Sequence, residues 1–214
     1  TLRHTLFPYT TLFRSPAVIS PSWLGRSSLE VAPALLGCRL MRRWPDGRQL
    51  TAVIVETEAY APGDPACHAY RRETPRNRVM FGPAGFSYVY LIYGMYHCFN
   101  VVTDADRVPS AVLIRAVELE TVPDWLQGYR KDKPTRWGAG PGKLCQLFDI
   151  DRTLTDRPLT SQTGLWLEPV RDAQGRYSLL AEDDVTQTTR IGLTQGADLP
   201  WRWYVTASPA VSKR

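Results

Sequence analysis

The sequence predicts a mixed α/β fold in one domain, or at most two small ones, with antiparallel strands in the middle of the chain. With 214 residues and 43% hydrophobic content, the chain can bury a sizeable core. β-Branched and aromatic runs at 52–60, 86–102 and 110–120 are bounded by turn residues, which is typical of strands. Segments 27–36 and 140–148 instead show the capping and periodicity of short helices.

The composition limits the class of partner. Twenty-six basic and 21 acidic residues give a formal net charge of +5, which favours a polyanionic partner without requiring one. No apolar run reaches the roughly 18 residues of a membrane span, so we expect no membrane partner and a cytoplasmic location. The four cysteines form no CxxC pair, which argues against a zinc ribbon and predicts free, mostly buried thiols.

The first 15 residues differ from the rest of the chain. They begin with Thr1 and repeat the letters TLF without helical or strand periodicity. Because they resemble a translated sequencing adapter, we expect a non-native leader over residues 1–15 and one domain over residues 16–214. Ser27 and Glu30 then have capping-box spacing before a short helix, which Gly37 ends.

The run 52–60 carries two glutamates inside an otherwise apolar strand. Period-two alternation places Glu56, Glu58 and Tyr60 on one face. Buried carboxylates are costly unless they are paired or used, so either glutamate can be a general base or half of a structural ion pair. Alternation does not distinguish between the two.

A basic loop follows at residues 66–80. It contains His68 and four arginines, with Thr74 and Asn77 between them: Arg71, Arg72, Arg76 and Arg78. Such a loop suits phosphate contacts, although a solvated surface loop is the commoner meaning. Adjacent Cys–His pairs at 67–68 and 97–98 lack zinc-ligand spacing, and the HxE and PCxxC patterns of nucleobase deaminases are absent.

The segment 86–100 is rich in tyrosine and nearly free of charge. Tyr88 and Tyr90 share one strand face, whereas Tyr93 points to the other face or leaves the strand at Gly94. These rings are either core or a stacking surface for a ligand.

Polar residues in the later strands are further candidates. Arg115 and Asn100 need partners if they are buried. The turn before Lys143 lacks the Walker pattern, yet its backbone amides and this lysine can hold a single phosphate. Segments 164–170, 176–183 and 190–214 show the pattern of strands and turns of the same domain.

Six motifs in this order resemble the alkyladenine (3-methyladenine) DNA glycosylase family over residues 22–213: VIVETEAY, HAYRRETPRNRVMF, YVYLIYGMYHCFNVV, VLIRAVE, GPGKLCQ and RIGLTQGADLPWRWYVTASPAVS. The resemblance implies a single α+β domain around a curved antiparallel sheet with peripheral helices. It also implies a bacterial monomer, associated with the nucleoid, that needs no metal or cofactor. Its implied substrate is double-stranded DNA containing damaged purines: 3-methyladenine, 7-methylguanine, hypoxanthine or ethenoadenine.

The resemblance also assigns roles to individual residues. Glu58 matches the general base, Arg115 a position near the flipped nucleotide's phosphate, and Tyr93 the ring that inserts into the duplex. Further positions match the base pocket, where Asn100 would exclude guanine: Tyr60, His68, Tyr90 and Asn100. Others match contacts to the DNA backbone: Thr74, Arg76, Met95 and Lys143.

No lysine matches a nucleophile, which implies hydrolysis rather than Schiff-base chemistry. The loop between His68 and Thr74 is one residue shorter than in the animal branch of the family, and His97 replaces a common aromatic residue. A catalytically silent nucleic-acid-binding module or a small-molecule transferase on a similar sheet are the alternatives. The combination of Glu58, Tyr93 and Asn100 favours the enzyme.

Overall fold

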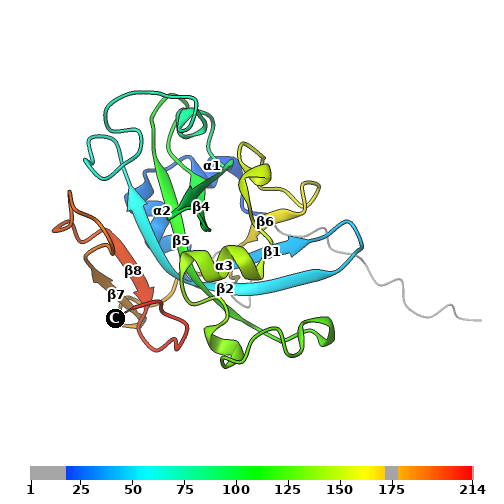
Figure 1. Cartoon of the computed structure of the whole chain (residues 1–214). Helices are drawn as coiled ribbons and strands as arrows, with labels where there is room; N and C mark the ends of the chain where they lie inside the picture. The colour runs from blue at the N-terminus through cyan, green and yellow to red at the C-terminus, as the bar shows by residue number, and fades with distance from the viewer. Residues whose placement is uncertain (1–17, 172–177, 214) are drawn as a thin grey trace, which may run out of the picture.

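The structure is a computed structural model that describes residues 18–171 and 178–213. The expected leader, residues 1–15, lies outside the described residues. The described chain forms a single domain in which a curled antiparallel sheet dominates and short helices lie at its periphery (Figure 1). None of its described helices combines the length and the hydropathy that a membrane crossing requires.

The strands and helices are short apart from one long strand. The strands are β1 (Arg39–Arg43), β2 (Gln49–Tyr60), β3 (Ser87–Ile92), β4 (Tyr96–Val102), β5 (Ala111–Leu119), β6 (Leu165–Glu168), β7 (Val185–Thr188) and β8 (Arg202–Val205). The α-helices are α1 (Pro21–Leu24), α2 (Ser28–Ala34) and α3 (Pro141–Leu147). Single 3₁₀ turns lie at Arg78–Phe81, Asp124–Leu126, Pro134–Arg136, Arg152–Leu154 and Glu182–Asp184.

The long strand β2 organises the sheet. The strand order is β3-β4-β5-β2-β1-β6, and β8 pairs with both β2 and β7. One edge of β2 pairs with β5, while its other edge pairs with β1 in the first half and with β8 at Glu56–Glu58. Register shifts between Ile54 and Thr57 mark a bulge, and bulges bend a strand. Figure 1 accordingly shows β2 as a long curved ribbon.

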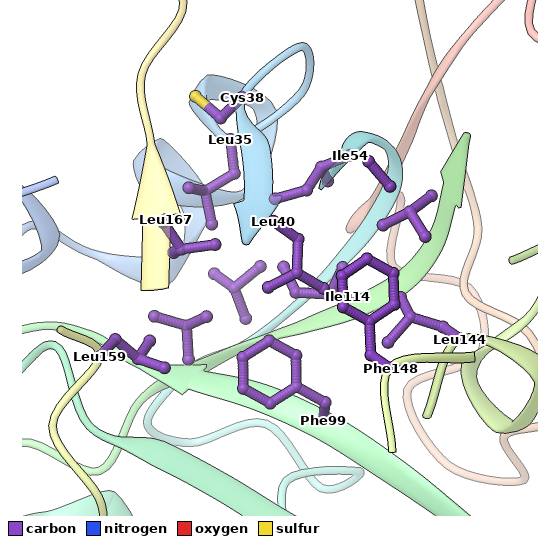
Figure 2. Packing of buried hydrophobic residues seen from close by; sticks show 14 of the residues in the cluster. Leu35, Cys38, Leu40, Ile54, Phe99, Ile114, Leu144, Phe148, Leu159 and Leu167 are labelled. Atoms are coloured by element: carbon purple, nitrogen blue, oxygen red, sulfur yellow. The ribbon is translucent and has the colours of Figure 1, made fainter. Parts of the chain in front are cut away.

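The main core lies between the helices and the sheet. Figure 2 shows Leu35, Leu40, Ile54, Phe99 and Phe148 converging from α2, β1, β2, β4 and the end of α3. A second, smaller cluster supports the edge where the tyrosine strand lies, and its members are Cys67, Ala69, Met80, Tyr88, Val102 and Ala111. All four cysteines are free and buried, as the sequence predicted.

The predicted elements agree with the structure with three differences. The helix after Ser27 is present, but Ser27 donates to the Glu30 carboxylate (2.9 Å) and makes no side-chain cap bond to the backbone. Helix α1 was missed because it has only one turn, with Pro21 at its start. The segment 176–183, for which strands and turns are predicted, forms no strand over residues 178–183, and β7 begins at Val185.

Candidate active site

The two glutamates of β2 lie in different environments. The Glu56 carboxylate is fully buried and accepts hydrogen bonds from Arg115 Nε (2.9 Å) and Arg202 Nη1 (3.0 Å). It also accepts bonds from the backbone N–H and the hydroxyl of Ser212 (2.7 and 2.9 Å). Because Glu56 pairs with two guanidinium groups and also holds the C-terminal segment through Ser212, it has the contacts of a structural ion pair.

Glu58 has fewer partners and lies next to the aromatic side chains. Its Oε1 accepts from the Ile191 N–H (2.8 Å) and lies 3.2 Å from Arg115 Nη1, and its Oε2 accepts from the Tyr60 hydroxyl (2.9 Å). Burial and the neighbouring Glu58 raise the pKa of Tyr60, so this phenol stays protonated and donates. Burial lowers the pKa of Arg115, but Glu58 and Glu56 raise it by more, and the guanidinium stays charged.

A cavity of about 180 Å³, here called the aromatic cavity, has Tyr60 in its wall. Its lining is mostly aromatic and apolar: Tyr60, Ala66, His68, Arg76, Met80, Tyr88, Tyr90, Ile92, Asn100, Ala111 and Leu193. All four residues that the resemblance assigned to a base pocket are therefore brought together. Tyr88 and Tyr90, which share one strand face, also line this cavity. These two rings are therefore available to a ligand and are not only part of the core.

Two hydrogen-bonding side chains connect along one wall of this cavity, beside a positive charge. His68 Nδ1 lies 2.8 Å from the Tyr88 hydroxyl, and the charge of Arg76 acts on both groups. His68 packs edge-on against Tyr90, with ring centroids 4.5 Å apart.

The same environment keeps His68 neutral. Burial and the nearby Arg76 charge lower the pKa of this imidazole from 6.5 to about 4. We therefore expect His68 to titrate near pH 4 in the folded protein and to be uncharged at neutral pH. Because the folded pKa is depressed, the corresponding stability is present above pH 6.5 and is lost as the pH falls towards 4.

An NMR titration of the histidine ring signals checks this, with His68→Gln used to assign the His68 signal. An inflection for His68 near pH 6.5 would contradict the expected neutral wall.

Asn100 is buried on β4 with its amide orientation fixed. Its Nδ2 donates to the backbone carbonyls of Tyr88 (3.0 Å) and Cys98 (3.4 Å). Since both amide donors have backbone partners, the carbonyl Oδ1 is the group that this side chain can present to a ligand.

A second, more open cavity of about 460 Å³ adjoins the first across Tyr60 and Tyr90 and is called the outer cavity. Arg115 and Lys143 line it together with Tyr93 and Tyr96 of the β3–β4 turn. Lys143 pairs with Asp132 (3.1 Å). Gly142 is required where α3 meets this turn, because a Cβ there would lie 2.8 Å from the Tyr96 ring.

Tyr93 is the most exposed large hydrophobic side chain among the described residues, at 79% exposure. Its φ of 53° lies in the left-handed region, which is unfavourable for a residue with a Cβ. Met95 beside it is also exposed (64%). An aromatic ring held outward on a strained turn suggests a contact surface rather than packing.

The basic loop is folded around one side chain. Asn77 is buried and donates to the carbonyls of His68 (2.8 Å) and Arg72 (3.0 Å), while its Oδ1 accepts from the Thr74 N–H (2.6 Å). Asn77 is thus a structural residue of this loop and not a free phosphate ligand. Arg76 lies at the wall of the aromatic cavity, although the resemblance placed it at the DNA backbone.

The sequence analysis did not identify the two charged residues that support Tyr60. Arg190 forms a buried two-bond pair with Asp64, its Nη1 donates to the Ala59 carbonyl (3.0 Å), and its guanidinium lies 4.8 Å from the Tyr60 ring centroid. Only the position of Arg190 at the start of the last motif signalled it. Within residues 18–171 and 178–213, no three His, Cys, Asp or Glu side chains gather as metal ligands would.

Comparisons with known proteins agree on one family. The model of the methylpurine-DNA glycosylase family matches residues 22–209, which is most of the chain. A protein of Trichodesmium erythraeum is 56% identical over 92% of this chain and 98% of its own length. One of Synechococcus sp. (strain JA-3-3Ab) is 52% identical over 89% and 96%, and both are assigned by name to 3-methyladenine DNA glycosylases. The chain therefore belongs to the methylpurine-DNA glycosylase family, whose members are hydrolases that cleave N-glycosidic bonds.

Proposed function

We propose that this protein is a monofunctional DNA glycosylase that extrudes an alkylated or deaminated purine from double-stranded DNA and hydrolyses its N-glycosidic bond, which initiates base excision repair. The observation that carries the proposal is the hydrogen bond that joins Glu58, the partner of Arg115, to Tyr60, a residue that lines the aromatic cavity. A glycosidic bond inside a duplex cannot be reached from outside, so the nucleotide must leave the stack before chemistry.

The aromatic cavity supplies a site for the extruded base. A damaged purine would lie against the rings of Tyr60, His68 and Tyr90, because aromatic rings can stack on a base whatever its identity. The bulk of the fixed Asn100 side chain would crowd the exocyclic amine of guanine, which disfavours normal guanine. Hypoxanthine and ethenoadenine lack that amine, and we include both among the substrates. 7-Methylguanine carries the same amine, and its excision relies on the positive charge of the base, which weakens the glycosidic bond.

Glu58 would act as the general base for a water molecule that attacks C1′. In this structure its side chain has no exposed area, since Tyr60 and Ile191 cover its two oxygens. The entering nucleotide must therefore displace the Tyr60 hydroxyl or the segment at 191–193 before water reaches the carboxylate. Arg115, which also lines the outer cavity and pairs with Glu58, would hold the phosphate of the extruded nucleotide.

One assay distinguishes a glycosylase from a catalytically silent nucleic-acid-binding module. The unmodified protein is incubated with labelled duplexes that carry one hypoxanthine or one 7-methylguanine, and products are resolved with and without hot alkali. We expect release of the free base and strand breaks only after alkali, because no lysine nucleophile is proposed. Tight binding without release of any damaged purine would establish the silent module instead.

Tyr93→Gly is expected to lower single-turnover excision of hypoxanthine about tenfold or more, since a stacked aromatic ring contributes roughly 1–3 kcal/mol to nucleic-acid binding. The same change should not destabilise the fold and should raise the free energy of unfolding by about 1 kcal/mol, because glycine accepts the positive φ without strain. Excision rates and urea unfolding curves measure the two effects. Trp125→Ala serves as the control, since this exposed ring lines neither cavity described above. Equal loss of excision in both variants would contradict a specific role for Tyr93.

A further inference from the structure

Arg76 brings a positive charge to the wall of the aromatic cavity. It is one of the residues that line the cavity, and its guanidinium carbon lies 5.7 Å from the centroid of the Tyr90 ring. Its charge also acts on Tyr88, whose hydroxyl contacts His68. Arg76 therefore lies beside tyrosines that a bound base would face, although the resemblance assigned it to the DNA backbone.

Both stacking tyrosines already have a cation over the ring. Arg190 lies 4.8 Å from the Tyr60 ring centroid and lines neither cavity, so it approaches Tyr60 from behind. Arg76 lies 5.7 Å from the Tyr90 ring centroid and, unlike Arg190, lines the aromatic cavity itself. A ring that faces one cation attracts a second cation less, because the two positive charges repel each other. Tyrosine rings without a cation beside them would favour a positively charged purine, but each of these two rings already faces a guanidinium.

We propose that Arg76 is a specificity-determining residue of the aromatic cavity, which disfavours purines with a permanent positive charge relative to neutral purines. The inference rests on the proposed glycosylase function. Methylation at N3 or N7 leaves the purine of a DNA nucleotide cationic, whereas hypoxanthine is neutral and presents carbonyl and ring-nitrogen acceptors. A guanidinium in the wall repels the first class and can donate hydrogen bonds to the second.

The loop offers a matched control for the charge. Arg78 lies two residues further on and is exposed like Arg76, but it lines neither of the two cavities. Arg76→Gln and Arg78→Gln remove the same charge from the same loop, so both weaken general attraction to DNA equally. Only Arg76→Gln removes the charge from the cavity wall. Arg76→Lys keeps the charge and loses the planar fork, and Arg76→Met is a second neutral replacement.

The experiment measures the second-order rate constant of excision, kcat/KM, with enzyme in excess over the duplex but below saturation. The duplexes carry one 7-methylguanine or one hypoxanthine, and spontaneous depurination is subtracted. In Arg76→Gln and Arg76→Met we expect the ratio of 7-methylguanine to hypoxanthine excision to rise about three- to tenfold, a modest value because the guanidinium is partly solvated. In Arg78→Gln and Arg76→Lys the ratio should stay within about twofold of the unmodified protein.

A ratio that stays unchanged or falls in both neutral Arg76 variants overturns the inference. A merely structural role for Arg76 would lower excision of both bases together and leave the ratio constant. If the unmodified protein releases neither base, the proposed function itself fails, which is distinguishable because no ratio then exists to compare.

Discussion

Glu58→Gln is expected to lower the single-turnover rate of hypoxanthine excision about 10²–10⁴-fold, the usual contribution of a general base. The glutamine oxygen can accept from the Ile191 N–H and its amide nitrogen can donate to the Tyr60 hydroxyl oxygen, while Arg115 keeps its bond to Glu56. The replacement thus removes the base with little rearrangement of its neighbours. Binding to a hypoxanthine duplex should change by only a few fold.

Rates under enzyme excess and gel-shift affinities measured on the same duplex separate chemistry from binding. If the variant retains a rate within about tenfold of the unmodified protein, Glu58 is not the base. If binding and rate fall together by the same factor, the glutamate supports the site without taking part in the chemistry.

Glu56→Gln is expected to destabilise the fold by about 3–5 kcal/mol, because it removes the carboxylate that two buried guanidinium groups share. The loss would be a large part of a typical domain's stability. The same carboxylate also holds the backbone N–H of Ser212, so the C-terminal segment should detach from β2 first. Urea unfolding followed by tryptophan fluorescence measures the change.

Glu120→Gln is the matched control for this substitution. Glu120 pairs with Arg39 at the surface, where both side chains are at least one third exposed, and such pairs contribute about 1 kcal/mol or less. A loss below about 1 kcal/mol in Glu56→Gln as well would show that its buried network is not structural. The two β2 glutamates would then not be separated into one structural and one chemical residue.

The sequence predicted which residues share a strand face, but it did not predict which of the two glutamates on that face is structural and which is chemical. Alternation placed Glu56, Glu58 and Tyr60 together, and the structure joins the first two through Arg115 and the last two by a hydrogen bond. It could not separate the glutamates, because the deciding partners, Arg202 and Ser212, lie about 150 residues later in the chain. Pairing between distant segments leaves no local periodicity in the sequence.

Two other features of the site depend on tertiary contacts in the same way. The bulge near Glu56 is a feature of pairing with β5 and has no signature within β2 itself. The support of Tyr60 by Arg190 and Asp64 joins two loops and depends on their approach in the folded chain. By contrast, the turn that projects Tyr93 was visible as Gly94 inside an aromatic run, since glycine inside a strand pattern marks a change of direction.

A crystal structure of the Glu58→Gln variant bound to a duplex with one hypoxanthine would show where the damaged base binds. We expect that the nucleotide is extruded, that its base lies in the aromatic cavity against Tyr60, His68 and Tyr90, and that the Tyr93 ring fills the gap. A hypoxanthine that remains stacked in the duplex, or one bound in the outer cavity beside Lys143, would contradict this expectation.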